Sequence, residues 1–331
     1  MVMTPAERAS AVAFSYKNCE LSSIVPSDAM VAAANSYQRG TIDLSDFVGT
    51  PEKQAQRLRQ EKSKSRNSEI FDADENEASE KTSIKFAGTD NDNQDDQQNG
   101  TKKSNQTQLG NKKQDQVRKP DETQLRDDRI FARCVRIIDC GWPAYGGLDE
   151  LKIIHRGLFV GAMNRAGTLR SEGGTATNHD MKNKANQPNR TDRSDSPQNH
   201  QPPSPYFPAS LIETGAANIF SQLNEKDHLS RLDRAGFIHA LAGIYDELNA
   251  LHPFNYGNGM VLRIFISELT HALGWDLNWG TVTFEGYRDA TDLALFEHDI
   301  SGLERMFASI IRLANPTRIF LISGWEQGPA H

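Results

Sequence analysis

Residues 252–263, HPFNYGNGMVLR, combine the side chains in this sequence best suited to chemistry on a phosphate. A histidine can accept a proton near neutral pH, and an arginine can bind phosphate oxygens through two N–H groups at once. Glycines between them would let backbone N–H groups approach an anion closely. The pattern predicts one general base and a phosphate site. The base is His252, and the phosphate-binding residues are Gly257, Asn258, Gly259 and Arg263.

Two helical patterns flank this stretch and must position it. Apolar residues recur at helical spacing on both sides: Phe237, Leu241, Ile244, Leu248 and Leu251 before it, and Val261, Ile264, Phe265 and Leu269 after it. The glycines lie where the second helix would begin, so its unpaired N–H groups and positive dipole end favour an anion there. A packing joint between two helices would use the same residues, so spacing alone leaves both interpretations open.

The stretch resembles the signature of the Fic family, HPFx(D/E)GNGRxxR. The shared residues are His252, Pro253, Phe254, Gly257, Asn258, Gly259 and Arg263. Two flanking segments are also similar to the family. Residues 164–170, NRAGTLR, resemble its WAGxxR segment, and SPYFPASLI, residues 204–212, resembles its substrate-docking flap.

The resemblance implies an all-α core and transfer of AMP from ATP to a Ser, Thr or Tyr hydroxyl of a target protein. It implies that His252 deprotonates this hydroxyl and that Phe254 is buried and anchors the loop. It further implies that residues 257–259 hold the α- and β-phosphates, while Arg263 binds the distal phosphate.

Two positions depart from the signature. Tyr256 replaces the acidic residue that binds Mg²⁺, and a neutral phenol is a poor magnesium ligand. Met260 replaces the first arginine and removes a cation from the phosphate clamp. We therefore expect ATP as substrate, and Mg²⁺ without its usual carboxylate ligand. The alternative is a catalytically weakened Fic domain that acts as a nucleotide- or protein-binding regulatory module; replacing His252 would separate the two.

Residues 1–50 look like the small antitoxins that partner Fic toxins, with a helix, a break at Pro26, and a second helix capped by Ser27. Those antitoxins act through (S/T)xxxE(G/N), whose glutamate pairs with the second arginine of the toxin motif. The resemblance aligns Glu20 with this glutamate and so predicts an inhibitory Glu20–Arg263 ion pair within the chain. A solvated glutamate on an ordinary surface helix is the competing interpretation.

Composition bounds the fold. Only 37% of the residues are hydrophobic and the mean hydropathy is −0.63, too polar for 331 residues to be compact throughout. We predict an antitoxin-like helical segment at 1–50, a disordered polar linker at 51–124 and a mainly α Fic-type domain at 125–315. That domain would carry a polar loop insertion at about 172–204 and a small β-hairpin flap at 206–211.

Other features narrow the class of protein. The net charge of −7 argues against a nucleic-acid partner, and no apolar run is long enough to cross a membrane. The three cysteines have no disulfide or zinc spacing, which fits a cytoplasmic protein. The remaining histidines, at 155, 239, 271 and 298, are too scattered to suggest a metal site, and we expect Trp275, Trp279 and Tyr287 mainly in the core.

Overall fold

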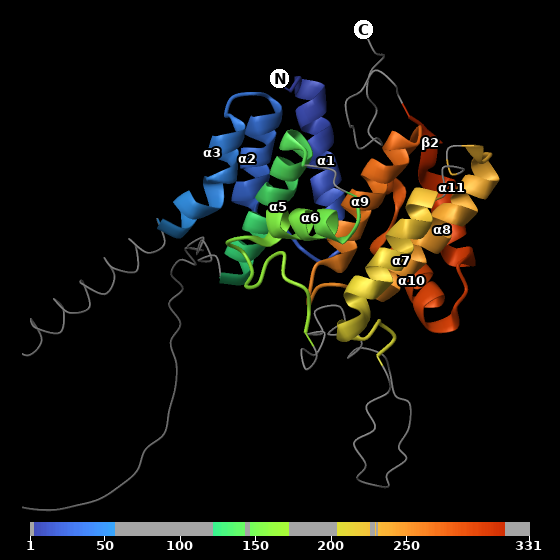
Figure 1. Ribbon diagram of the computed structural model, residues 1–331. Helices are drawn as coiled ribbons and strands as arrows, with labels where there is room; N and C mark the ends of the chain where they lie inside the picture. Colours follow the sequence, from blue (N-terminus) through green and yellow to red (C-terminus); the bar gives the residue numbers. More distant parts are fainter. Residues whose placement is uncertain are drawn as a thin grey trace, which may run out of the picture. The chain divides into compact units, whose positions relative to one another are not determined.

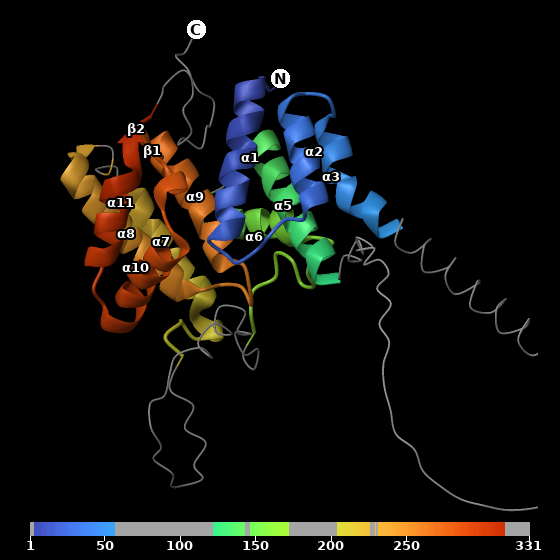
Figure 2. The ribbon, with the colours of Figure 1, turned by 180° about the vertical axis from the view of Figure 1, so that it is seen from behind.

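A computed structural model describes residues 3–56, 122–142, 146–171, 204–225, 229 and 231–314. Most of the predicted linker and nearly all of the predicted insertion lie outside these residues. The chain divides into two units, and the first, Met1–Pro51 with Glu122–His331, contains the helices and strands labelled in Figures 1 and 2.

The described residues are mainly helical, as the sequence predicts. The helices are α1 Pro5–Glu20, α2 Asp28–Gln38, α3 Leu44–Val48, α5 Glu122–Cys140, α6 Leu148–Phe159, α7 Ile212–Glu225, α8 Arg234–Leu251, α9 Asn258–Ala272, α10 Phe284–Glu297 and α11 Ser301–Ile310. None of them has the length and apolar character needed to cross a bilayer.

The N-terminal helices have well-defined starts. At α1, the Thr4 hydroxyl accepts from the backbone N–H of Glu7, and the Glu7 carboxylate accepts from that of Thr4, forming a capping box. Ser27 caps α2, which confirms the predicted break and restart at this point. Its N–H and hydroxyl also bind the buried Asp128 carboxylate of α5, at 2.7 and 2.6 Å.

The predicted segment 1–50 does not stand apart from the following domain. Its apolar residues, including Val12, Phe14 and Met30, belong to the same hydrophobic core as α5 and α9. Figures 1 and 2 show α1 to α3, in blue, beside α5, in green. The predicted linker boundaries also differ from the structure, because residues 50–56 are helical and α5 already begins at residue 122.

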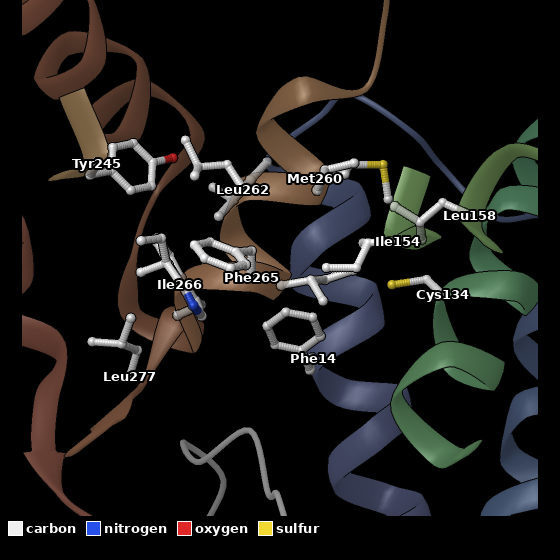
Figure 3. Packing of buried hydrophobic residues seen from close by; sticks show 14 of the residues in the cluster. Phe14, Cys134, Ile154, Leu158, Tyr245, Met260, Leu262, Phe265, Ile266 and Leu277 are labelled. Carbon is white, nitrogen blue, oxygen red and sulfur yellow. The ribbon is translucent and has the colours of Figure 1, made fainter. Parts of the chain in front are cut away.

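Helix α9 lies at the centre of the core. It contacts α6 and α1 on one side and α8 on another, and nearly all of its first ten residues are buried. In Figure 3, Met260 points toward Leu158 of α6, while Leu262 points toward Tyr245 of α8. This central position buries most sides of the helix and surrounds its N-terminus with the neighbouring helices.

One small sheet is present in the described part of the chain. Strand β1, Trp275–Leu277, pairs antiparallel with β2, Ile311–Leu313. In the sequence the two strands are separated by the 3-10 helix η4, Trp279–Thr281, and by α10 and α11. The β-hairpin predicted at 206–211 is wrong. Ala209–Leu211 form a 3-10 helix, η2, and Pro208 just before it lacks the N–H that a strand ladder requires.

Candidate functional site

His252 lies at the C-terminal end of α8. Its backbone adopts the left-handed conformation with φ of 43°, and its side chain is buried. Burial lowers the pKa of the imidazole to about 3, and the nearby positive charge of Arg170 acts in the same direction. The ring is therefore uncharged at neutral pH, the state in which a histidine can accept a proton.

The loop after His252 is closed by Asn258. The backbone N–H of Phe254 donates to the Asn258 carboxamide oxygen at 2.9 Å, and the Asn258 amide donates back to the Phe254 carbonyl at 2.8 Å. Phe254 itself is fully buried. The Asn258 side chain therefore holds the loop together, which leaves its backbone N–H as the group available to a phosphate.

Gly257 precedes α9 in a backbone conformation and a close contact that favour glycine. Its φ is +72°, and a Cβ there would lie 2.2 Å from the Phe159 ring. Helix α9 then starts at Asn258 without a side-chain cap, so the N–H groups of its first turn have no acceptor within the helix. Such a helix start attracts anions through its unpaired donors and its dipole.

Arg263 projects from the next turn of α9 and is almost completely buried. Its Nε donates to the side-chain oxygen of Asn18 at 2.7 Å. Its Nη2 donates to the Asn18 carbonyl at 2.9 Å and the Ser22 hydroxyl at 2.6 Å. Its Nη1 has no hydrogen-bond partner among the described residues. Three contacts from the N-terminal segment thus occupy the guanidinium.

The other face of Arg263 lies against Tyr287. The guanidinium carbon is 4.7 Å from the ring centre, and the Tyr287 hydroxyl shares a 2.7 Å hydrogen bond with that of Tyr245. A Cβ at Gly259 would lie 3.1 Å from both the Nη1 atom and the Tyr287 hydroxyl. Gly259 therefore leaves room for this pair, and Tyr287 supports the arginine from the core.

The predicted Glu20–Arg263 ion pair is wrong. The Glu20 carboxylate instead binds the Lys17 ammonium at 2.8 Å, and its side chain is 55% exposed. Asn18 lies on the buried face of α1, and Ser22 follows just after the helix ends at Glu20; both reach Arg263, while the Glu20 side chain points away. The comparison with the antitoxin motif considered only its glutamate and so identified neither Asn18 nor Ser22. The position of Asn18 on the buried face could have indicated it.

Neither departure from the Fic signature supplies charge. The Tyr256 hydroxyl donates to the Asn164 carbonyl, and burial raises its pKa, so it remains a neutral phenol. The Met260 side chain is fully buried, and its carbonyl accepts from the Asn18 amide at 3.3 Å. A neutral phenol and a thioether therefore do not fit a protein-bound Mg²⁺ at this position.

His155 supports the loop from α6, a role that its sequence position did not reveal. Its Nδ1 accepts from the Gly167 N–H at 2.7 Å, so its Nε2 carries the proton and donates to the Tyr256 carbonyl at 3.1 Å. The ring stacks on Phe254 with centroids 4.0 Å apart. Burial lowers the pKa of His155 to about 4.

His155 should make stability depend on pH. Its folded-state pKa of about 4 lies below the ordinary 6.5, so its contribution is full above pH 6.5 and is lost as the pH falls toward 4. The loss is on the order of 3 kcal/mol. Urea unfolding across this range should show a weaker pH dependence in His155→Gln, whose amide can make both hydrogen bonds without titrating. An unchanged pH dependence would contradict this assignment.

A cavity of about 400 Å³ opens elsewhere, between η4, α10 and α11. None of the residues from 252–263 lines it. Trp279 and Tyr287 are buried, as expected of core residues, while Trp275 is half-buried against Phe237.

Comparison with known proteins places this site in a family. Residues 147–270 match the model of the Fic/DOC family. The chain is 27% identical over 169 residues to a probable protein adenylyltransferase Fic of Escherichia coli K12, covering 51% of this chain and 72% of the relative. It is 42% identical over 71 residues to the protein adenylyltransferase VbhT of Bartonella schoenbuchensis, covering 22% and 15%.

A solved structure of the BepC protein of Bartonella tribocorum with bound AMPPNP is similar at 21% identity and a TM-score of 0.45, covering 59% of this chain and 88% of that one. The family match spans His252, the loop after α8 and the uncapped start of α9. Residues 147–270 are therefore a Fic/DOC domain, homologous to protein adenylyltransferases.

Proposed function

We propose that the chain transfers AMP from ATP to a hydroxyl of a target protein. The observation that supports this most strongly is the position of His252. This buried, neutral histidine lies at the end of α8, and residues 253–257 connect it to the uncapped start of α9. A base and an anion site held by one rigid loop suit a reaction in which a hydroxyl attacks a phosphate.

In the proposed step, the hydroxyl oxygen of the target bonds to the α-phosphorus of ATP, and the bond from that phosphorus to the bridging oxygen of pyrophosphate breaks. His252 accepts the hydroxyl proton, and pyrophosphate leaves with the bond's electron pair. The first-turn N–H groups of α9 hold the phosphates beside Gly257 and Gly259, and Arg263 binds the distal phosphate. We assign this site to a catalytic domain spanning residues 125–315.

The position of the label in ATP tests the reaction. The full-length chain would be incubated with a cell lysate and ATP carrying label on either the α- or the γ-phosphate. AMP transfer places only the α-label on protein, with loss of pyrophosphate. Label from the γ-position that rises above that of the lysate alone, with no rise from the α-position, would instead indicate phosphorylation by the chain and refute the proposal. ATP binding without transfer in any variant of the chain would support the alternative of a nucleotide-binding regulatory module.

We also propose that the N-terminal segment restrains this site through a neutral latch, formed by Asn18 and Ser22 on Arg263. Arg263 is 1% exposed and its Nε and Nη2 are already engaged, so a distal phosphate that binds the guanidinium through these two nitrogens must displace the Asn18 and Ser22 contacts. Neutral oxygens bind a guanidinium less strongly than a carboxylate does. The hydrogen bonds of the latch should therefore break more readily than the Glu20–Arg263 ion pair implied by the antitoxin motif.

Removing the latch should strengthen ATP binding. In the double variant Asn18→Ala and Ser22→Ala, Arg263 loses two acceptors, each worth about 1.5–3 kcal/mol to a charged donor. Isothermal titration calorimetry should then show ATP affinity increased by roughly tenfold or more. Ser22→Glu should have the opposite effect, because it would offer a carboxylate to the guanidinium.

Glu20→Ala provides the matched control. It lies on the same helix but binds Lys17 and not Arg263, so ATP affinity should stay within about twofold of wild type. A gain in affinity from Glu20→Ala, with none from the Asn18 and Ser22 double variant, would contradict the latch and restore the glutamate as the inhibitory residue.

A further inference from the structure

The Tyr206 ring lies flat against the His252 imidazole. The ring centroids are 3.8 Å apart and the planes meet at 22°, which is a stacked arrangement. Tyr206 belongs to the segment before η2, far from His252 in sequence. The contact covers a face of the histidine and contributes to its burial, with 6% of the residue exposed.

Arg170 links the segment 204–208 to the C-terminal end of α8 through hydrogen bonds. Its Nε donates to the His252 carbonyl at 2.6 Å, and its Nη2 donates to the carbonyls of Phe207 and Leu251. Backbone hydrogen bonds reinforce the junction: the Arg170 N–H donates to the Pro253 carbonyl at 2.9 Å, and the Phe207 N–H donates to the Ala250 carbonyl at 3.0 Å. One guanidinium thus ties the residue after Tyr206 to the backbone of the histidine.

The geometry points to Tyr206 as a positioning residue for His252, held in place by Arg170. The stack fixes the plane of the imidazole and shields one of its faces from water, while Arg170 holds the backbone on which the imidazole is carried. The inference rests on the proposed role of His252 as general base. It adds a function for the 204–208 segment that does not depend on how that segment meets a target protein.

The stack also bears on the protonation of His252. The titratable groups facing the imidazole from the described segments are Arg170 and Tyr206. Arg170 disfavours a second positive charge, and the burial to which Tyr206 contributes disfavours any charge on the ring. Loss of the tyrosine ring would admit water and favour the protonated imidazole, which cannot act as a base.

The His252 pKa can be followed directly by NMR in the full-length chain, from the carbon-bound imidazole proton, assigned with a His252→Gln variant. In Tyr206→Ala we expect the pKa to rise from its depressed value toward the ordinary value of about 6.5. The rate of AMP transfer at about pH 5.5, relative to about pH 7.5, should fall by up to roughly tenfold, because less of the imidazole is neutral. The KM for ATP should not change.

Tyr206→Phe is the matched control, since it keeps the ring and removes only the hydroxyl; its His252 pKa and pH profile should match wild type. Arg170→Lys keeps the charge but loses the forked hydrogen bonds, and should shift the pKa in the same direction as Tyr206→Ala. An unchanged His252 pKa in folded Tyr206→Ala and in Arg170→Lys would overturn the inference. Because the NMR titration needs no turnover, a shifted pKa in a chain without transferase activity would refute only the proposed function.

Discussion

Replacing His252 by alanine should lower the rate of AMP transfer by roughly 10²–10⁴-fold, the usual contribution of a general base. The imidazole is buried and uncharged at neutral pH, and residues 253–257 join His252 to the uncapped start of α9. ATP affinity should change little, because the phosphate donors belong to α9 and Arg263. Initial rates with labelled ATP, together with calorimetric ATP binding, would measure both quantities.

His239→Ala gives a matched control on the same helix, since this histidine is exposed and pairs with Glu304 at the surface. Its rate should equal that of wild type. Retained activity in His252→Ala would show that another group removes the proton, and would leave His252 with only a structural role at the end of α8.

Gly257→Ala should disrupt both the fold and the site. An alanine at φ of +72° costs about 1–2 kcal/mol, and its Cβ would lie 2.2 Å from the Phe159 ring, where overpacking costs about 1–3 kcal/mol more. The loop must shift, and a displacement of about 1 Å at a reacting centre can cost 10²-fold in rate. We expect a lower midpoint in urea unfolding and nearly complete loss of AMP transfer.

Gly243→Ala is the corresponding control. This glycine lies within α8, and nothing would contact its added Cβ within 4 Å. Alanine in a helix interior is favoured over glycine by about 0.5–1 kcal/mol, so this variant should be slightly stabilised and fully active. If Gly257→Ala were as stable and as active as Gly243→Ala, the close approach of the loop to Phe159 would have no functional importance.

The helical patterns and the motif could be predicted because each depends on nearby residues. The apolar spacing of 237–251 and 261–273 indicated α8 and α9, and Ser27 marked the start of α2. The Fic signature then brought His252 and Arg263 together, and the structure has both on the elements that flank the loop.

Features that depend on distant contacts could not be predicted. Which face of α1 meets α9 decides whether Glu20 or Asn18 reaches Arg263, and that choice follows from packing of the whole core. Similarly, His155 looked like one scattered histidine, yet α6 carries its ring against Phe254. The hairpin flap predicted at 206–211 is wrong because Pro208 lacks the N–H of a strand ladder and the helical turn Ala209–Leu211 leads directly into α7.

The proposed neutral latch would change the expected regulation. A carboxylate on Arg263 would hold the N-terminal segment through a charge-assisted pair, whereas Asn18 and Ser22 contact the guanidinium through neutral oxygens. Because α1 shares the hydrophobic core with α5 and α9, the segment need not leave for the arginine to be freed. A local rearrangement at the end of α1 would be sufficient.

The most direct test compares transfer of α-phosphate label from ATP to lysate proteins by three full-length chains: wild type, the Asn18→Ala and Ser22→Ala double variant, and the same double variant carrying His252→Ala. We predict weak labelling by wild type, stronger labelling by the double variant and none without His252. If the double variant bound ATP more tightly than wild type yet labelled no protein, the domain would be a nucleotide-binding module and not a protein adenylyltransferase.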